Sequence, residues 1–115
     1  MEPPHLIPLV ELVPGKETSQ ETMKIVEELM KKIGKVPVIL RKEIPGHIAN
    51  RLQAAAWREA IDLVNRGVAS VEDVDKALYA GPGIRWAFMG SNLTLHLGVG
   101  SGGITYFIEH LGPAF

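Results

Sequence analysis

The chain has 115 residues, which is enough for about one domain with a single hydrophobic core. Its hydrophobic content of 46% and charged content of 22% are those of a folded protein and argue against disorder. A formal net charge of −1 argues against a nucleic-acid or anionic-membrane partner, and the lack of cysteine excludes disulfides and thiolate sites. With no apolar run near the roughly 20 residues of a membrane span and no signal pattern, we expect a cytoplasmic protein.

The first element is predicted to be a strand over residues 6–13, because this apolar run is short and ends at Pro14-Gly15. Pro8 has no amide hydrogen and should lie at the start of the strand or on a sheet edge. A second short apolar run, Val36 to Arg41, predicts another strand.

A helix from about Thr18 to Ile33 is predicted between the two strands. Thr18 and Glu21 have the spacing of a capping box, apolar residues recur at helical spacing, and Gly34 supplies a left-handed stop. Two strands joined by a helix favour a parallel pair.

The next segment predicts a long helix from about His47 to Arg66, with Pro45 in its first turn and Gly67 at its end. Its apolar residues cover too much of the circumference for one narrow stripe. This breadth predicts a central helix with neighbours on several sides.

The last part of the chain is predicted to be helical. Ser70 should cap a short helix that runs to about Tyr79, and Gly81-Pro-Gly83 should break the chain. Further helices are expected from Ile84 to Leu97 and from Gly103 to Leu111. The glycine-rich residues between them lack the lysine of a phosphate-binding loop, so we interpret them as a connection.

Several segments together resemble the 3-hydroxyacyl-CoA dehydrogenase family. They are Pro3–Gly15, the run Ile-Pro-Gly-His-Ile-Ala-Asn-Arg at residues 44–51, Gly67–Lys76 and Gly81–Ala87. The last two are similar to the branch that includes lambda-crystallin and L-carnitine dehydrogenase. The resemblance implies a mainly α fold: a helical C-terminal domain like that of 6-phosphogluconate dehydrogenase, residues 43–115, preceded by a strand–helix–strand remnant of the nucleotide-domain edge, residues 1–42.

The resemblance also implies which parts of a dehydrogenase site to expect. The family motif His-Pro-x-Asn-Pro-Pro carries the catalytic histidine, and since Pro3 and Pro4 match its end, the histidine position lies before Met1. Relatives bind NAD through an N-terminal domain that would also lie upstream. We therefore expect this chain to bind no cofactor and to lack NAD-dependent activity by itself. Glu11 matches the glutamate that orients the histidine, and Asn50 matches an asparagine of the substrate cleft.

Glu11 and His47 are the candidate catalytic residues. His47 stands where the family usually has an apolar residue, and with Glu11 and Asn50 it would form a cluster able to transfer a proton or polarise a carbonyl. The alternative is a surface histidine beside an unused glutamate and asparagine.

Arg85 and Trp86 are candidate substrate-binding residues, because arginine binds carboxylates in a bidentate manner. An alternative of equal weight is that Trp86 belongs to the core and that Arg85 is a surface residue at the start of a helix. The four histidines have no recognised ligand spacing, so no metal site is expected.

The preferred hypothesis is a substrate-cleft and dimerisation domain of an oxidoreductase that acts in fatty acid metabolism. A homodimer or larger homo-oligomer is expected, because family C-terminal domains form much of the dimer interface and a two-stranded sheet is marginal alone. A small-molecule substrate is expected. The alternatives are a small cofactor-independent enzyme, hydrolytic or proton-transferring, that uses Glu11, His47 and Asn50, and a truncated chain without an independent task.

Overall fold

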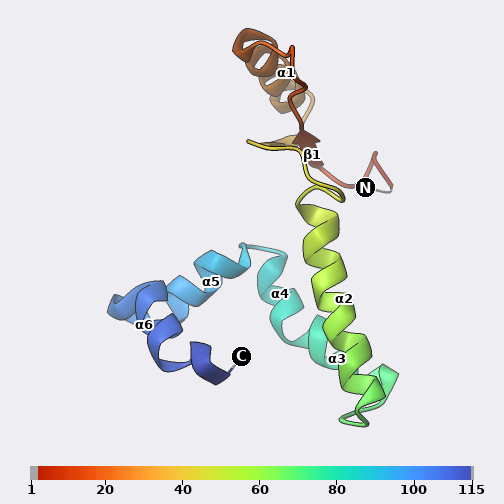
Figure 1. Ribbon diagram of the computed structural model, residues 1–115, viewed down its shortest axis with the longest axis vertical. Helices are drawn as coiled ribbons and strands as arrows, with labels where there is room; N and C mark the ends of the chain where they lie inside the picture. Colours follow the sequence, from red (N-terminus) through yellow and green to blue (C-terminus); the bar gives the residue numbers. More distant parts are fainter. Residues whose placement is uncertain (1–2, 115) are drawn as a thin grey trace. The chain divides into compact units, whose positions relative to one another are not determined.

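The computed structural model describes residues 3–114, and the chain divides into two compact units, residues 1–57 and 58–115. The first unit holds β1 (Leu9–Leu12), α1 (Gln20–Lys32), β2 (Val36–Ile39) and the start of α2 (Ala49–Asn65) (Figure 1). The second holds the end of α2 and a series of short helices: α3 (Val71–Ala80), α4 (Pro82–Trp86), α5 (Ser91–Gly98), η1 (Gly100–Gly102), α6 (Gly103–His110) and η2 (Gly112–Ala114). The predicted fold class, a strand–helix–strand unit followed by helices, is confirmed. The predicted domain boundary at residue 42 stays a prediction.

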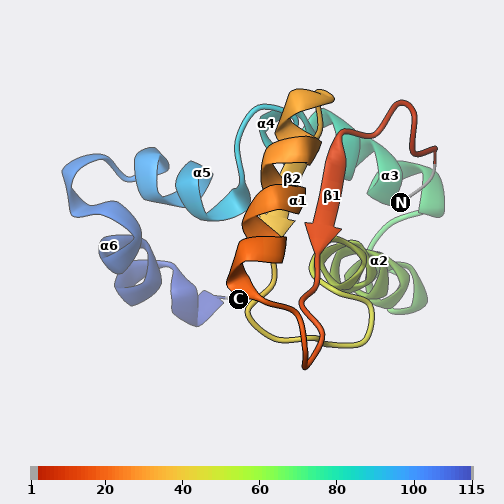
Figure 2. The same ribbon diagram turned by 90° about the horizontal axis from the view of Figure 1, so that it is seen from above.

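The two strands form a parallel pair, as predicted, with Leu9 opposite Val36 and Leu12 opposite Ile39. The Val36 amide donates to the Pro8 carbonyl over 2.8 Å. Pro8 lies immediately before β1 and accepts a ladder bond without having to donate one. Helix α1 packs on this pair and returns the chain to the start of β2 (Figure 2).

The core of the first unit lies under this crossover. Among the described residues, the buried large hydrophobic side chains are Leu12, at the end of β1, and Leu40, directly after β2. Three apolar residues of α1 are partly covered, whereas a second apolar stripe at i, i+4 and i+8 is exposed: Ile25, Leu29 and Ile33. Helix α1 thus has two apolar faces, of which one is partly covered and the other is exposed.

Helix α1 begins two residues later than predicted. Ser19 is its N-cap, with its hydroxyl accepting from the Thr22 amide at 3.0 Å, while the Thr18 hydroxyl accepts from the Gly15 amide instead. The capping-box prediction was therefore wrong by one residue, because Thr18 closes the preceding turn. The predicted stop at Gly34 is confirmed by its φ of +79°.

The start of α2 was predicted wrongly. Ile44 to His47 form a turn in which the His47 amide donates to the Ile44 carbonyl over 3.0 Å, and Gly46 has a φ of +79°. This is the sequence pattern of a type II turn, with proline second and glycine third. Pro45 therefore belongs to this turn and not to the first turn of the helix, and α2 begins at Ala49.

Neighbours on several sides of α2 stay a prediction. Among the described residues of each unit, no other strand or helix packs on the part of α2 that belongs to that unit. The indole of Trp57, at the end of the first unit, is 69% exposed.

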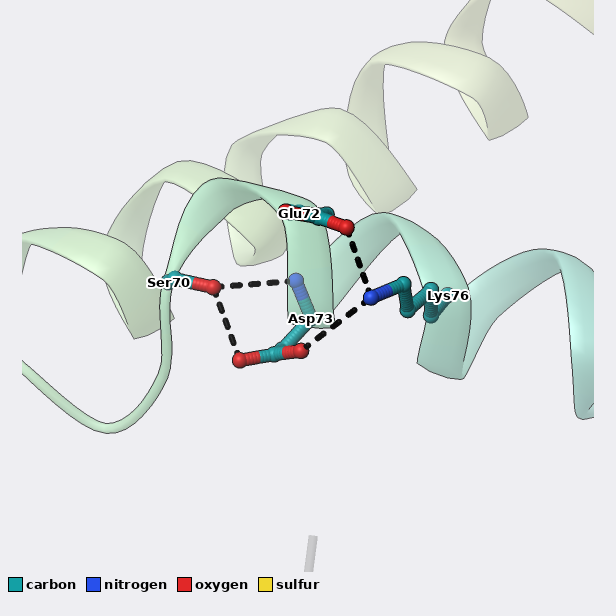
Figure 3. A network of polar contacts seen from close by, with 4 residues as sticks. All are labelled: Ser70, Glu72, Asp73 and Lys76. Atoms are coloured by element: carbon teal, nitrogen blue, oxygen red, sulfur yellow. Dashed lines mark hydrogen bonds and ion pairs between the residues drawn. The ribbon is translucent and has the colours of Figure 1, made fainter.

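In the second unit, the predicted helix after Ser70 is confirmed as α3. The Ser70 hydroxyl accepts from the Asp73 amide at 3.1 Å and bonds to the Asp73 carboxylate at 2.8 Å (Figure 3). Lys76 pairs with Glu72 at 2.7 Å on the same helix. All these contacts lie within seven residues, so they stabilise α3 locally.

The predicted single helix from residue 84 to 97 is two helices, α4 and α5. Backbone bonds from Ala87, Phe88 and Met89 close α4, and Gly90 then adopts an extended ψ of 157°. The carbonyl of Gly90 accepts the first bond of α5, from the Thr94 amide. Gly90 acts as the N-cap of α5. The prediction of one helix failed here because the apolar residues on both sides of Gly90 recur at helical spacing.

Helix α6 begins at Gly103, as predicted. The Nδ1 atom of His96 accepts from the Ile104 amide at 3.2 Å and so caps α6 from α5. Gly103 has a φ of +58° and lies so close to the imidazole that an added Cβ would be 2.7 Å from its Cε1 atom.

Within residues 3–114, no helix has the length and apolarity needed to cross a membrane.

Candidate functional site

The first unit contains an open cavity of about 310 Å³ beside β1 and the turn before α2. Its volume lies at the lower end of the range of small-molecule sites, roughly 300–1,000 Å³. Apolar and polar residues share the lining: Pro4, Ile7, Leu9, Val10, Glu11, Lys35, His47 and Asn50.

Glu11 joins β1 to the N-terminus of α2. One carboxylate oxygen, Oε1, accepts from the Ile48 amide at 2.6 Å and from the Ala49 amide at 3.3 Å. These amides belong to the end of the helix that carries a partial positive charge, where a carboxylate is stabilising. The interaction fixes Glu11 as an anchored anion and leaves its second oxygen, Oε2, as an acceptor.

His47 lies in the turn that leads into α2 and has a φ of +50°. The left-handed region costs a residue with a Cβ about 1–2 kcal/mol. The side chain is half-buried, and its imidazole has no hydrogen-bond partner among residues 3–114. His47 therefore brings two free ring nitrogens to the cavity.

Lys35 lies between α1 and β2 and reaches back to the N-terminal turn. Its ammonium donates to the Pro4 carbonyl and, over 3.1 Å, to the Ile7 carbonyl. No carboxylate of the described residues forms an ion pair with it. The side chain thus holds the turn at residues 3–7 against the start of β2 and keeps an unneutralised charge at the cavity.

The structure brings three of the five predicted site residues to this cavity, namely Glu11, His47 and Asn50. Their assigned roles stay predictions. Arg85 and Trp86 belong to α4 in the second unit, where both side chains are exposed, and their roles also stay predictions.

Sequence reasoning missed Lys35. The lysine follows the helix stop at Gly34 and resembles any exposed lysine at a helix end, so its spacing carries no signal. Its position at the cavity depends on the pairing of β2 with β1, which places residue 35 beside the turn that precedes β1.

The connection between β1 and α1 lacks the features of a dinucleotide-binding turn. Phosphate-binding βαβ units place glycine-rich backbone at the first strand–helix turn and leave the helix N-terminus open to the anion. Here the connection of residues 13–19 has a single glycine, Ser19 caps α1, and Glu21 adds a negative charge in the first turn. No group of three or more His, Asp or Glu within residues 3–114 is placed to hold a metal ion.

Comparison with protein families gives two matches that together cover nearly all of the chain. Residues 46–114 match the model "3-hydroxyacyl-CoA dehydrogenase, C-terminal domain". Residues 1–44 match the model "3-hydroxyacyl-CoA dehydrogenase, NAD binding domain".

Two curated relatives illustrate the similarity. An L-carnitine dehydrogenase of Bacillus cereus is 52% identical over 112 residues, which are 97% of this chain and 34% of the relative. A 3-hydroxyacyl-CoA dehydrogenase of Gibberella moniliformis is 48% identical over 114 residues, 97% of this chain and 35% of the relative. The chain thus spans about a third of the length of the curated relatives it matches.

Two crystal structures are similar in fold. One is 5-formyl-3-hydroxy-2-methylpyridine 4-carboxylic acid 5-dehydrogenase, described as an NAD⁺-dependent dismutase; it has a TM-score of 0.84 and 34% identity over 99% of this chain and 37% of its own. The other is a 3-hydroxyacyl-CoA dehydrogenase of Archaeoglobus fulgidus, with a TM-score of 0.73 and 30% identity over 97% of this chain and 39% of its own.

Proposed function

The chain belongs to the 3-hydroxyacyl-CoA dehydrogenase family, and from this premise we propose that it supplies the substrate side of a dehydrogenase site together with a surface for subunit association. The observation that carries the first part is the anchored carboxylate of Glu11 in a cavity shared with His47 and Asn50. The substrate we propose is a small 3-hydroxy acid or a related carboxylic acid. In support, one relative is named for L-carnitine, which is a 3-hydroxy acid, and a similar structure is named for a pyridine carboxylic acid.

In this proposal Glu11 orients an acid/base histidine and does not act as the base itself. Its Oε1 atom is held by the two amides at the start of α2, so the carboxylate is fixed while Oε2 remains an acceptor. A carboxylate that holds one imidazole nitrogen fixes the tautomer and stabilises the charged form. The family motif places the histidine four positions before Pro3, and Pro4, the last residue of the motif, lines the cavity.

Asn50 lies in the first turn of α2, and its amide is the natural donor to the substrate oxygen on which negative charge develops. The pyrophosphate of the dinucleotide is not placed at the β1–α1 connection in this proposal, because Ser19 caps α1 and Glu21 lies in its first turn. In this proposal residues 3–114 bind and orient the substrate, and Glu11 orients the histidine that takes the hydroxyl proton.

A chimera tests the proposal directly. These 115 residues replace the corresponding third of the Bacillus cereus L-carnitine dehydrogenase, and NAD binding, measured by fluorescence, reports a folded nucleotide domain. The chimera is expected to oxidise L-carnitine, and Glu11→Gln in it should lower kcat roughly 10- to 100-fold. Glu17→Gln, an exposed glutamate of the β1–α1 connection, is the matched control and should leave kcat unchanged. A chimera that binds NAD without oxidising substrate contradicts the proposal.

The 115-residue chain alone is expected to show no NAD binding in isothermal titration calorimetry. A micromolar affinity would show that these residues contain a dinucleotide site after all.

Subunit association is the second part of the proposal, and it is supported by the second unit's uncovered apolar side chains. Phe88, between α4 and α5, is 84% exposed, and large apolar residues on α3, α5 and α6 are exposed as well. Apolar surface of this kind marks an interaction site. We propose a homodimer through these helices, visible in sedimentation velocity. Phe88→Ser should shift the chain toward monomer, whereas Leu6→Ser, a comparably exposed residue of the first unit, should not.

A second candidate function is favoured by the two free ring nitrogens of His47. A cofactor-independent hydrolytic or proton-transfer enzyme would use His47 or Glu11 as base and Asn50 as oxyanion donor. If His47→Ala and Glu11→Gln leave every detected turnover of the chain unchanged, this candidate fails.

A further inference from the structure

The ammonium of Lys35 has one unused donor at the cavity. An ammonium group carries three N–H donors. Two of them bond to the carbonyls of Pro4 and Ile7, and neither carbonyl neutralises the charge. Because the side chain is half-buried and unpaired with any carboxylate of residues 3–114, its third donor and its charge remain available to a ligand.

His47 adds a second donor to the same cavity, at a cost in backbone strain. Its φ of +50° is one that glycine would adopt without a penalty. Strain of this kind persists where the surroundings fix it, and it clusters at ligand sites. The imidazole gains no bond within the described residues in return, which points to a ligand as its partner.

The one acidic side chain of the cavity does not cancel these donors. Glu11 forms no ion pair with Lys35 and uses Oε1 for the backbone amides of Ile48 and Ala49. The cavity therefore presents a charged donor and an imidazole as well as a single free carboxylate oxygen. A ligand that satisfies both kinds of group has an anionic end and a hydroxyl end.

We propose that Lys35 and His47 bind the carboxylate of a small hydroxy acid, which leaves the hydroxyl for Asn50 and, in the absence of the acid/base histidine, for the free Oε2 atom of Glu11. The proposal rests on the proposed function in taking this cavity as the substrate side, and it assigns two residues that select an acid over a neutral ester. A cavity of about 310 Å³ suits a ligand of this size.

The test uses the full chain, isotopically labelled, with 3-hydroxybutyrate and its methyl ester as probes in NMR titrations. The acid is expected to bind at least about tenfold more tightly than the ester, as one charge-assisted hydrogen bond provides. Lys35→Met and His47→Phe should each remove most of this preference, and Lys35→Arg should keep it. Lys24→Met, an exposed lysine of α1 outside the cavity, is the control and should behave as the parent chain does.

Equal binding of acid and ester by the parent chain, or no binding of either at millimolar concentration, overturns the proposal. So does a full acid preference in both Lys35→Met and His47→Phe. A failure of this proposal can be distinguished from a failure of the proposed function. An active chimera with no acid preference refutes the carboxylate site alone, whereas acid-selective binding by the chain beside an inactive chimera refutes the dehydrogenase role alone.

Discussion

The two units of this chain are held together by different kinds of contact. In the first unit, side chains link residues far apart in sequence: Glu11 reaches the amide of Ile48, and Lys35 reaches the carbonyl of Pro4. In the second, most side-chain bonds join residues three or four positions apart, such as Ser70 to Asp73 and Arg66 to Asp62. One longer contact there is that of His96, which bonds to the Ile104 amide eight residues away.

The two units also differ in how many of their residues are buried. The buried large hydrophobic residues described in the chain, Leu12 and Leu40, belong to the first unit, and the one buried residue described in the second is Gly103. Local contacts define each helix of the second unit and leave its apolar surface uncovered. The comparison teaches that long-range contacts assemble the candidate site in the first unit, whereas local contacts in the second leave large apolar side chains exposed.

The largest expected effect concerns the contact between Gly103 and His96 in the second unit. Gly103→Ala should destabilise the chain by about 2–4 kcal/mol, because alanine would be strained at this backbone conformation and its methyl group would overlap His96. The change is measured by urea denaturation monitored by circular dichroism.

Gly98→Ala is the matched control. Gly98 is the last residue of α5 and has open space at its Cβ position, so alanine should raise the stability by up to about 0.5–1 kcal/mol. If both variants are equally destabilised, the His96–Gly103 contact does not organise the second unit.

Glu11→Ala should come next, with a loss of about 2 kcal/mol, since a carboxylate is removed from two backbone amides. The effect should appear far from the substitution, as faster hydrogen exchange at residues 48 and 49. Glu43→Ala, an exposed glutamate without a partner among the described residues, should leave that exchange unchanged. Unaltered exchange in Glu11→Ala would remove the long-range link that distinguishes the first unit.

The smallest expected effect is local. Ser70→Ala removes the N-cap of α3 and should cost about 1 kcal/mol, with faster exchange confined to α3. Lys76→Met, which breaks exposed ion pairs of the same helix, should cost less than about 0.5 kcal/mol. Exchange changes that extend from Ser70→Ala into α5 or α6 would show that the second unit is less locally determined than its contacts indicate.

Local signals in the sequence determined the class and order of the elements. Ser70 before an acidic turn predicts α3, and Gly34 after an apolar helix predicts the stop, because caps and left-handed glycines act within one turn of the chain. Parallel pairing of the strands followed from the helix between them. The candidate residues Glu11, Asn50 and His47 were found from the family resemblance, and their shared cavity from the structure.

What only the tertiary structure decided are the contacts between residues distant in sequence and the boundaries that depend on them. The start of α2 at Ala49 follows from a left-handed turn at residues 46–47 and from the Glu11 carboxylate, 37 residues away from its bond partner Ile48. Lys35 gained its place at the cavity in the same way. A helical pattern records which residues are apolar, but not which neighbour covers them, and so it gave no sign that Trp57 and Phe88 are exposed.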